Sequence, residues 1–286
     1  MFLVIACSQP PQVSDAITQT AEQAKATSAP TMAATERPQP TATASAATVT
    51  VAPSQAEEST ATAPAQPTES GNYEGVPVGF TDGGYPYLGE PDAPVTLEEY
   101  SDYLCSYCAR HVEQTFPTLM EKYIRTGKVK LVFRDLPLAS LHQNSPKGHA
   151  ATACVAEQGA DLYWKMHYDL FKRAGGWAGL ANPSEFLRAS AKKAGADMDA
   201  YDACMASGRA EARVKESIAA ADDLGFRSTP SFRFIRTDTG ASYNLVGAQP
   251  IATFSQWIEA LLAGKEPPHG ADAGGQGSQA ALLGEQ

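Results

Sequence analysis

The alternation of apolar and polar residues from Pro94 to Tyr100 predicts a first strand, with Val95, Leu97 and Glu99 on one side. A helical pattern follows from Ser106 to Arg125 and ends near a glycine. The run from Lys128 to Arg134 then predicts a second strand. The order strand, helix, strand predicts a βαβ unit.

A block of helical patterns follows the second strand, and each pattern ends near a glycine or a loop. We expect helices at about 149–158, 161–173, 184–194, 199–206 and 209–224. Strands are then predicted at 231–236 and 242–246 around a turn, with a last helix at 251–263. This order predicts an α/β thioredoxin-like fold (βαβ … ββα) with an all-helical insertion, at about 141–224, between its two halves.

Composition divides the 286 residues into segments. Residues 8–72 contain no aromatic side chain and are rich in Ala, Thr, Pro and Ser, so we expect a disordered tether. A lead-in segment at 73–88 then precedes a folded domain at 89–266, and 267–286 is expected to be a flexible tail. The net charge of −10 argues against nucleic-acid binding, and no run of 18 apolar residues predicts a membrane span.

Cys105 and Cys108 form a Cys-x-x-Cys motif where the first strand leads into the first helix. Unpaired N–H groups at a helix start favour a thiolate, so we expect an exposed, acidic Cys105 and a shielded Cys108. This setting is typical of a redox dithiol. A zinc half-site and an inert structural bridge are the alternatives, although no second close pair of cysteines supplies further zinc ligands.

The residues Val4 to Cys7 resemble the lipobox of bacterial lipoproteins, in which the cysteine receives the lipid. Segment 1–7 is therefore interpreted as a signal remnant with Cys7 as the lipidation site. The tether that follows suits a domain held at a membrane by that lipid alone. The alternative is an unpaired cysteine without a special role.

The folded part resembles the DsbA-like thiol–disulfide oxidoreductases, in particular a branch common among exported bacterial proteins. The matching segments are 89–95, 100–108, 126–129, 133–138, 153–159, 164–167, 202–204 and 228–232. The resemblance implies an extracytoplasmic protein of the cell envelope that oxidises thiols of exported substrate proteins through its own disulfide, without another cofactor or metal. It also implies a quinone-linked membrane partner that reoxidises the domain.

The same resemblance implies roles for single residues. Cys105 is expected to be the nucleophile and Cys108 the resolving thiol. Thr229 and Pro230 match the cis-proline loop that pairs with substrate. Glu99 matches a buried acid beneath the disulfide, and on this basis we expect it to exchange a proton with Cys108.

The two residues between the cysteines, Ser106 and Tyr107, are expected to tune the redox potential and to contact substrate. Ser106 departs from the family, which often has proline there. Cys154 and Cys204 recur together in some relatives and are expected to form a structural disulfide, the alternative being two free buried thiols. The direction of catalysis stays open between oxidase and reductase or isomerase. A competing class is a metallochaperone or a peptide-binding module of the same fold.

Overall fold

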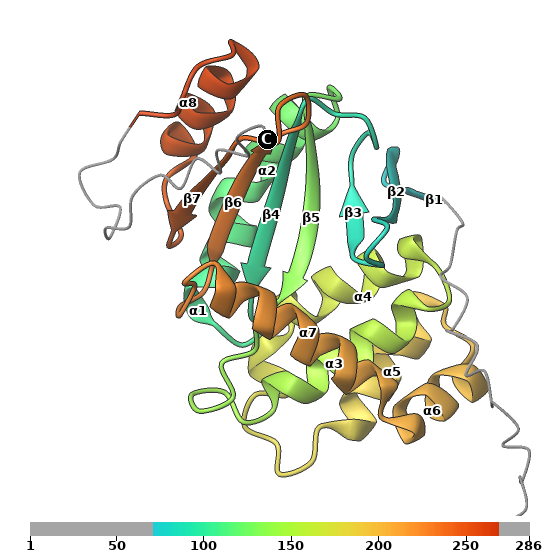
Figure 1. Ribbon diagram of the computed structural model, residues 1–286. Helices are drawn as coiled ribbons and strands as arrows, with labels where there is room; N and C mark the ends of the chain where they lie inside the picture. Colours follow the sequence, from blue (N-terminus) through green and yellow to red (C-terminus); the bar gives the residue numbers. More distant parts are fainter. Residues whose placement is uncertain (1–70, 269–286) are drawn as a thin grey trace, which may run out of the picture. The chain divides into compact units, whose positions relative to one another are not determined.

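The computed structural model describes residues 71–268, and its seven strands form one mixed sheet in the order β1-β2-β3-β5-β4-β6-β7 (Figure 1). The strands are β1 (Gly71–Tyr73), β2 (Val76–Phe80), β3 (Pro86–Leu88), β4 (Val95–Ser101), β5 (Val129–Asp135), β6 (Ser231–Arg236) and β7 (Ser242–Val246). β4 runs parallel to β5 and antiparallel to β6, so the central strand is the one that leads into the Cys-x-x-Cys motif.

The lead-in segment predicted at 73–88 is part of this sheet, so the predicted domain start at 89 and tether end at 72 are both wrong. β1 pairs with β2, β2 with β3 and β3 with β5. Gly89 follows β3 with φ +118, where a Cβ would lie 2.6 Å from the Val129 carbonyl oxygen, so this close approach requires glycine. Cys7, the rest of the predicted tether and most of the predicted tail lie outside the described residues.

The predicted first helix is a continuous helical run whose hydrogen-bonding pattern changes along its length. It consists of α1 (Ser106–Arg110), the π-helical η1 (His111–Thr115), α2 (Phe116–Leu119) and the π-helical η2 (Met120–Ile124). Pro117 lacks an N–H group and crowds the carbonyl four residues earlier, and the wider π turn directly before it relieves that clash.

The predicted helical insertion is present between β5 and β6. Its elements are α3 (Ser145–Ala156), α4 (Ala160–Lys172), the 3₁₀ turn η3 (Ala174–Gly176), α5 (Ser184–Ala194), α6 (Met198–Ser207) and α7 (Arg209–Asp223). These helices lie at the end of the sheet where β4 and β5 point, and α8 (Ile251–Leu262) packs against β4 and α2 (Figure 1). The observed order confirms the predicted thioredoxin-like fold with an insertion.

The main apolar core is continuous from the sheet into the insertion. Its largest fully buried side chains include Trp164, Phe133, Phe232 and Phe254, from helices and strands of both parts. Cys105 and Cys108 belong to this same core. The dithiol therefore lies at the boundary between the sheet and the helices that cover its end.

Candidate active site

Cys105 is the N-cap of α1 and Cys108 lies one turn further into the helix. Both are free thiols in this structure. Cys108 is fully buried and Cys105 is only 6% exposed. The predicted shielding of Cys108 agrees with the structure, whereas the predicted exposure of Cys105 is wrong because the Thr229 carbonyl oxygen lies 3.4 Å from its sulfur.

The two thiols have opposite acidities. The Cys108 thiol donates to the Cys105 sulfur and this lowers the pKa of Cys105 most, against the opposing effect of burial. Thr229 and the backbone N–H groups of Cys108 and Tyr107 contribute further, and together they bring the pKa of Cys105 to about 5. Burial and the neighbouring Cys105 sulfur raise the pKa of Cys108 well above its ordinary value. One thiolate and one thiol is the pattern that disulfide exchange requires.

The Thr229–Pro230 bond is cis, and both residues are buried beside Cys105. The Thr229 hydroxyl is buried and has no hydrogen-bond partner within the described part of the chain. Pro230 directly precedes β6, which pairs with β4. These contacts bring the loop expected from the family resemblance to the sulfur that is expected to react.

Ser106 and Tyr107 lie on the outer side of the helix start. Ser106 is exposed and Tyr107 is 57% exposed, with the Arg110 guanidinium 4.8 Å from its ring centroid. An exposed tyrosine with a cation over its ring presents an apolar face and a charge beside the dithiol. This position is compatible with the substrate contact expected for both residues.

Glu99 is buried as expected, on the side of β4 that carries Val95 and Leu97. Burial raises the pKa of its carboxyl to about 7, partly offset by the Ser101 side chain. Ser101 also lowers the pKa of Cys108, which places its side chain near both groups, and its buried hydroxyl has no hydrogen-bond partner within residues 71–268. The neighbouring Glu98 is instead paired with Arg134 at 2.8 Å.

Sequence reasoning missed Ser101 and His111. His111 Nε2 lies 3.7 Å from Glu99 Oε2, and the side chains of both residues are almost completely buried. The signal was present in the sequence, because Ser101 lies two residues after Glu99 on a strand and His111 three residues after Cys108 on a helix. A spacing of two on a strand places Ser101 on the same face as Glu99, and a spacing of three on a helix places His111 on the same face as Cys108.

A second group of polar residues that sequence reasoning missed fixes the turn before Cys105. The Asp102 carboxylate accepts hydrogen bonds from the backbone N–H groups of Leu104 and Leu138, each at 2.8 Å, and from the Ser145 hydroxyl. Its burial raises its pKa, but His149, Ser145, His142 and the Leu138 N–H outweigh that effect and lower it overall. Asp102 is therefore held as an anion.

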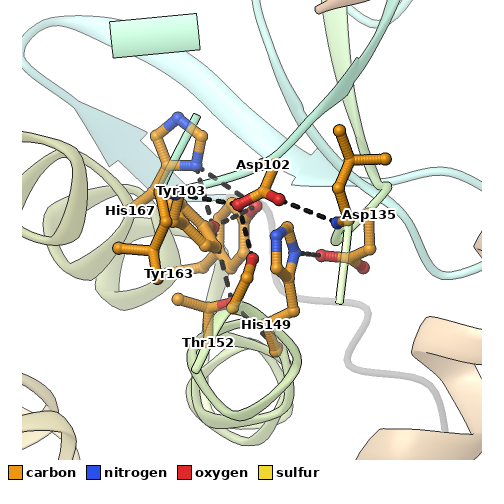
Figure 2. Close-up of polar contacts among 10 residues, drawn as sticks. Asp102, Tyr103, Asp135, His149, Thr152, Tyr163 and His167 are labelled. Atoms are coloured by element: carbon orange, nitrogen blue, oxygen red, sulfur yellow. Dashed lines mark hydrogen bonds and ion pairs between the residues drawn. The ribbon is translucent and has the colours of Figure 1, made fainter. Parts of the chain in front are cut away.

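The next residue, Tyr103, is tied to the insertion (Figure 2). Its hydroxyl lies 3.1 Å from His167 Nδ1, 3.3 Å from the Tyr163 hydroxyl and 3.4 Å from the Thr152 hydroxyl. Beside it, His149 pairs with Asp135 at 2.6 Å. Residues of α3 and α4 thus hold the two residues that follow β4.

Cys154 on α3 and Cys204 on α6 form a disulfide, with their Cα atoms 5.6 Å apart. This is the pairing that the family resemblance implied, and it excludes two free thiols at these positions. Both sulfurs belong to the core of the insertion and are fully buried. Within residues 71–268, no three His, Cys, Asp or Glu side chains lie close enough together to hold a metal ion.

Fold and dithiol together define a member of the thioredoxin family, and the family described as Thioredoxin matches residues 81–259. The chain belongs to that family. The fold is shared with solved DsbA-like structures, which confirms the predicted resemblance. BdbD from Bacillus subtilis (oxidised) has a TM-score of 0.57 and 21% identity, covering 64% of this chain and 95% of that one. Wolbachia pipientis alpha-DsbA1 has a TM-score of 0.54 and 24% identity, covering 62% and 90%.

Curated relatives fall into two kinds. Disulfide bond formation protein D of Bacillus subtilis is 32% identical over 90 residues, covering 32% of this chain and 40% of that protein. A Na(+)/H(+) antiporter, NhaA 3 of Salinispora tropica, is 31% identical over 191 residues, covering 66% of this chain and 28% of that protein. The chain thus spans well under half the length of these relatives. Within residues 71–268, every helix is too short or too polar to span a bilayer.

Proposed function

We propose that the domain is a thiol–disulfide oxidoreductase that oxidises pairs of thiols in other proteins. The observation that carries the proposal is the opposite shift of the two cysteine pKa values at the start of α1. A stabilised Cys105 thiolate favours the reduced domain, and a stable reduced form makes the oxidised form a ready donor of its disulfide. Relatives named disulfide bond formation protein D support the same reaction.

The reaction proceeds in two exchanges. A substrate thiolate attacks the Cys105 sulfur of the oxidised domain, so the Cys105–Cys108 bond breaks and Cys108 leaves as a thiolate that takes up a proton. The second thiolate of the substrate then attacks the substrate sulfur that is bonded to Cys105 in the mixed disulfide, and Cys105 leaves as a thiolate. The substrate gains one disulfide, and the domain keeps both electrons as a Cys105 thiolate and a Cys108 thiol.

The surroundings of the dithiol supply three further functions. The low pKa of Cys105 makes it the better leaving group in the second exchange. Glu99 is proposed as the group that gives a proton to Cys108 and later removes it, since its own pKa of about 7 suits transfer in both directions. Thr229, Pro230, Ser106 and Tyr107 are proposed to contact the substrate, because they surround Cys105 or lie exposed beside it.

The domain is further proposed to act outside the cytoplasm, where protein disulfides persist. The disulfide between Cys154 and Cys204 supports that location. The sequence at Val4 to Cys7 supports the proposal of a lipid anchor at Cys7. A membrane partner linked to quinones is proposed to accept the electrons.

Two measurements on the purified chain test the proposal. Oxidised protein mixed with a reduced, unfolded substrate should transfer its disulfide, and Cys105→Ala should abolish transfer while leaving the Cys154–Cys204 bridge intact. Equilibration with glutathione should give a reduction potential for the Cys105–Cys108 pair nearer −120 mV, the value of a strong oxidant, than −270 mV, that of a reductase. Absence of transfer would refute the exchange reaction, and a potential near the lower value would refute its direction.

A further inference from the structure

His111 is a buried histidine whose ring nitrogens have no hydrogen-bond partner in the described part of the chain. The Glu99 carboxylate lies close to it, with 3.7 Å between Nε2 and Oε2, and the other Glu99 oxygen is also without a partner among the described residues. Buried polar groups without partners are costly and uncommon. Two of them facing each other beneath a reactive dithiol require an explanation.

Strand and helix periodicity place four polar side chains opposite one another. Glu99 and Ser101 lie on the same face of β4, and Cys108 and His111 lie three residues apart on one face of the helix. The Ser101 side chain affects the pKa values of both Cys108 and Glu99, while His111 contacts Glu99. The four groups form a buried row in the order Cys108, Ser101, Glu99, His111.

The rest of the surroundings of His111 is apolar. Its ring centroid lies 4.7 Å from that of Phe232 on β6 and 5.2 Å from that of Phe254 on α8. On the side of β4 away from β6, Glu99 is in register with Phe133 of β5. The contacts place His111 at the end of the row, between the Glu99 carboxylate and two aromatic rings.

We propose that His111 is a positioning residue for the proton acceptor of Cys108, because its neutral imidazole can pair with Glu99 in both protonation states of the carboxyl. The inference rests on the proposed function. One imidazole tautomer donates its Nε2–H to a carboxylate, and the other accepts the proton of a carboxylic acid at Nε2. A change of tautomer therefore keeps Glu99 paired before and after it takes up a proton.

The electrostatic setting keeps His111 neutral. Burial lowers the pKa of His111 to about 3, so the imidazole stays uncharged above that pH. Glu99 contributes to the pKa values of Tyr103 and Tyr168; burial raises both, and the two tyrosines remain protonated at neutral pH. No Lys or Arg of the described region offsets the burial of Glu99. Glu99 is thus the group of this row that titrates near neutrality.

The step that His111 supports is the resolution of a mixed disulfide. Cys105 is first joined to a sulfur of an oxidising disulfide. The Cys108 thiol gives its proton to the Glu99 carboxylate, and the resulting thiolate attacks the Cys105 sulfur. The Cys105–Cys108 bond forms, the outer sulfur leaves as a thiolate, and Glu99 holds the proton until Cys108 is next released by substrate.

The expected effect of removing His111 has a definite sign. Hydrogen bonds to a charged group are stronger than those to a neutral one, so a missing imidazole disfavours the carboxylate more than the acid. In His111→Phe the pKa of Glu99 should rise. We expect the pH midpoint of the resolution step to move upward by about one unit from its wild-type position, with a rate about tenfold lower at pH 6.

Stopped-flow and quenched-flow measurements with the full chain test this expectation. Reduced protein is mixed with oxidised glutathione, and the resolution of the mixed disulfide is followed from pH 5 to 9. His111→Gln, which keeps a donor and an acceptor, should shift the midpoint less than His111→Phe. Glu99→Gln should remove the midpoint, and adding His111→Phe to it should change nothing further. Glu98→Gln, on the opposite face of β4, is the matched control and should keep the wild-type midpoint.

A measurement on the wild type covers the case in which His111→Phe does not fold. Ring ¹⁵N shifts should show His111 neutral throughout and changing tautomer across the pH range in which Glu99 titrates. Three results would overturn the role of His111. They are a folded His111→Phe with an unchanged midpoint, a double variant that resolves the mixed disulfide more slowly than Glu99→Gln, or a His111 tautomer that does not change as Glu99 titrates. A wild type that forms or resolves no mixed disulfide at any pH would instead overturn the proposed function.

Discussion

The acidity of Cys105 should make the stability of the reduced protein rise with pH in a predictable range. The folded chain lowers the pKa of this thiol from its ordinary value of 9.0 to about 5, first through the thiol of Cys108. A group with a lowered pKa stabilises the fold above its folded pKa and loses that contribution as the pH falls through it. The stabilisation is therefore absent below about pH 5 and complete above about pH 9.

Its magnitude follows from the shift. Each pH unit between the two pKa values adds about 1.4 kcal/mol, so the thiolate contributes about 3 kcal/mol at pH 7. Glu99 acts in the opposite direction, because its raised pKa of about 7 costs stability as the pH rises from about 4.5 to 7. The total stability of the wild type is the sum of both effects, and a difference between two proteins is needed to separate them.

Cys105→Ser provides that difference, because serine keeps the size of the side chain and does not ionise while Glu99 is unchanged. Urea unfolding of both proteins under reducing conditions from pH 4 to 8 gives the two free energies of unfolding. The free energy of unfolding of the wild type minus that of Cys105→Ser should be constant up to about pH 5. It should then rise by about 1.4 kcal/mol per pH unit. Oxidised wild type, which lacks the thiolate, should not show this rise. A difference that stays constant or falls over the range would refute the reasoning.

Two further predictions concern the parts that support the dithiol. Replacing Cys154 and Cys204 together by alanine should lower the free energy of unfolding by about 4 kcal/mol, since the bridge closes a loop of 50 residues. Disulfide exchange should survive, and an unchanged urea midpoint in non-reducing buffer would contradict the bridge. Asp102→Asn should cost about 2–3 kcal/mol, because an amide cannot accept from Leu104, Leu138 and Ser145 at once. Thermal unfolding within experimental error of the wild type would show that this cluster is not stabilising.

The extent to which the sequence predicts this molecule differs between its parts for physical reasons. β4, β5, β6 and β7 were predicted to within about one residue, because their apolar runs lie in or next to a buried sheet centre. β1 to β3 were missed because they have only three to five residues and contain Pro77, Gly79 and Pro86, which are rare in strands. β3 joins the centre of the sheet by pairing with β5, and this long-range contact is one that no local pattern contains.

The site shows the same division between local and long-range information. The Cys-x-x-Cys motif at a strand-to-helix junction predicted the direction of the Cys105 pKa shift, because the Cys108 thiol, its largest cause, and the helix-start N–H groups are all local. Its burial was not predicted, because the covering residue, Thr229, is 124 residues away in sequence. Without the family resemblance, the position of Pro230 beside the dithiol could not have been predicted either.

The helical insertion contributes to the dithiol as well as covering the sheet. Asp102 and Tyr103 link β4 to Cys105, and each is fixed by side chains of α3 or α4 (Figure 2). The Cys105 backbone N–H donates to the Asp102 carbonyl oxygen at 3.1 Å, so a shift of Asp102 would displace the helix start directly. The Cys108 thiol lowers the pKa of Cys105 most, and N–H groups at that helix start lower it further, so the packing of the insertion helps to set the reactivity of the thiol.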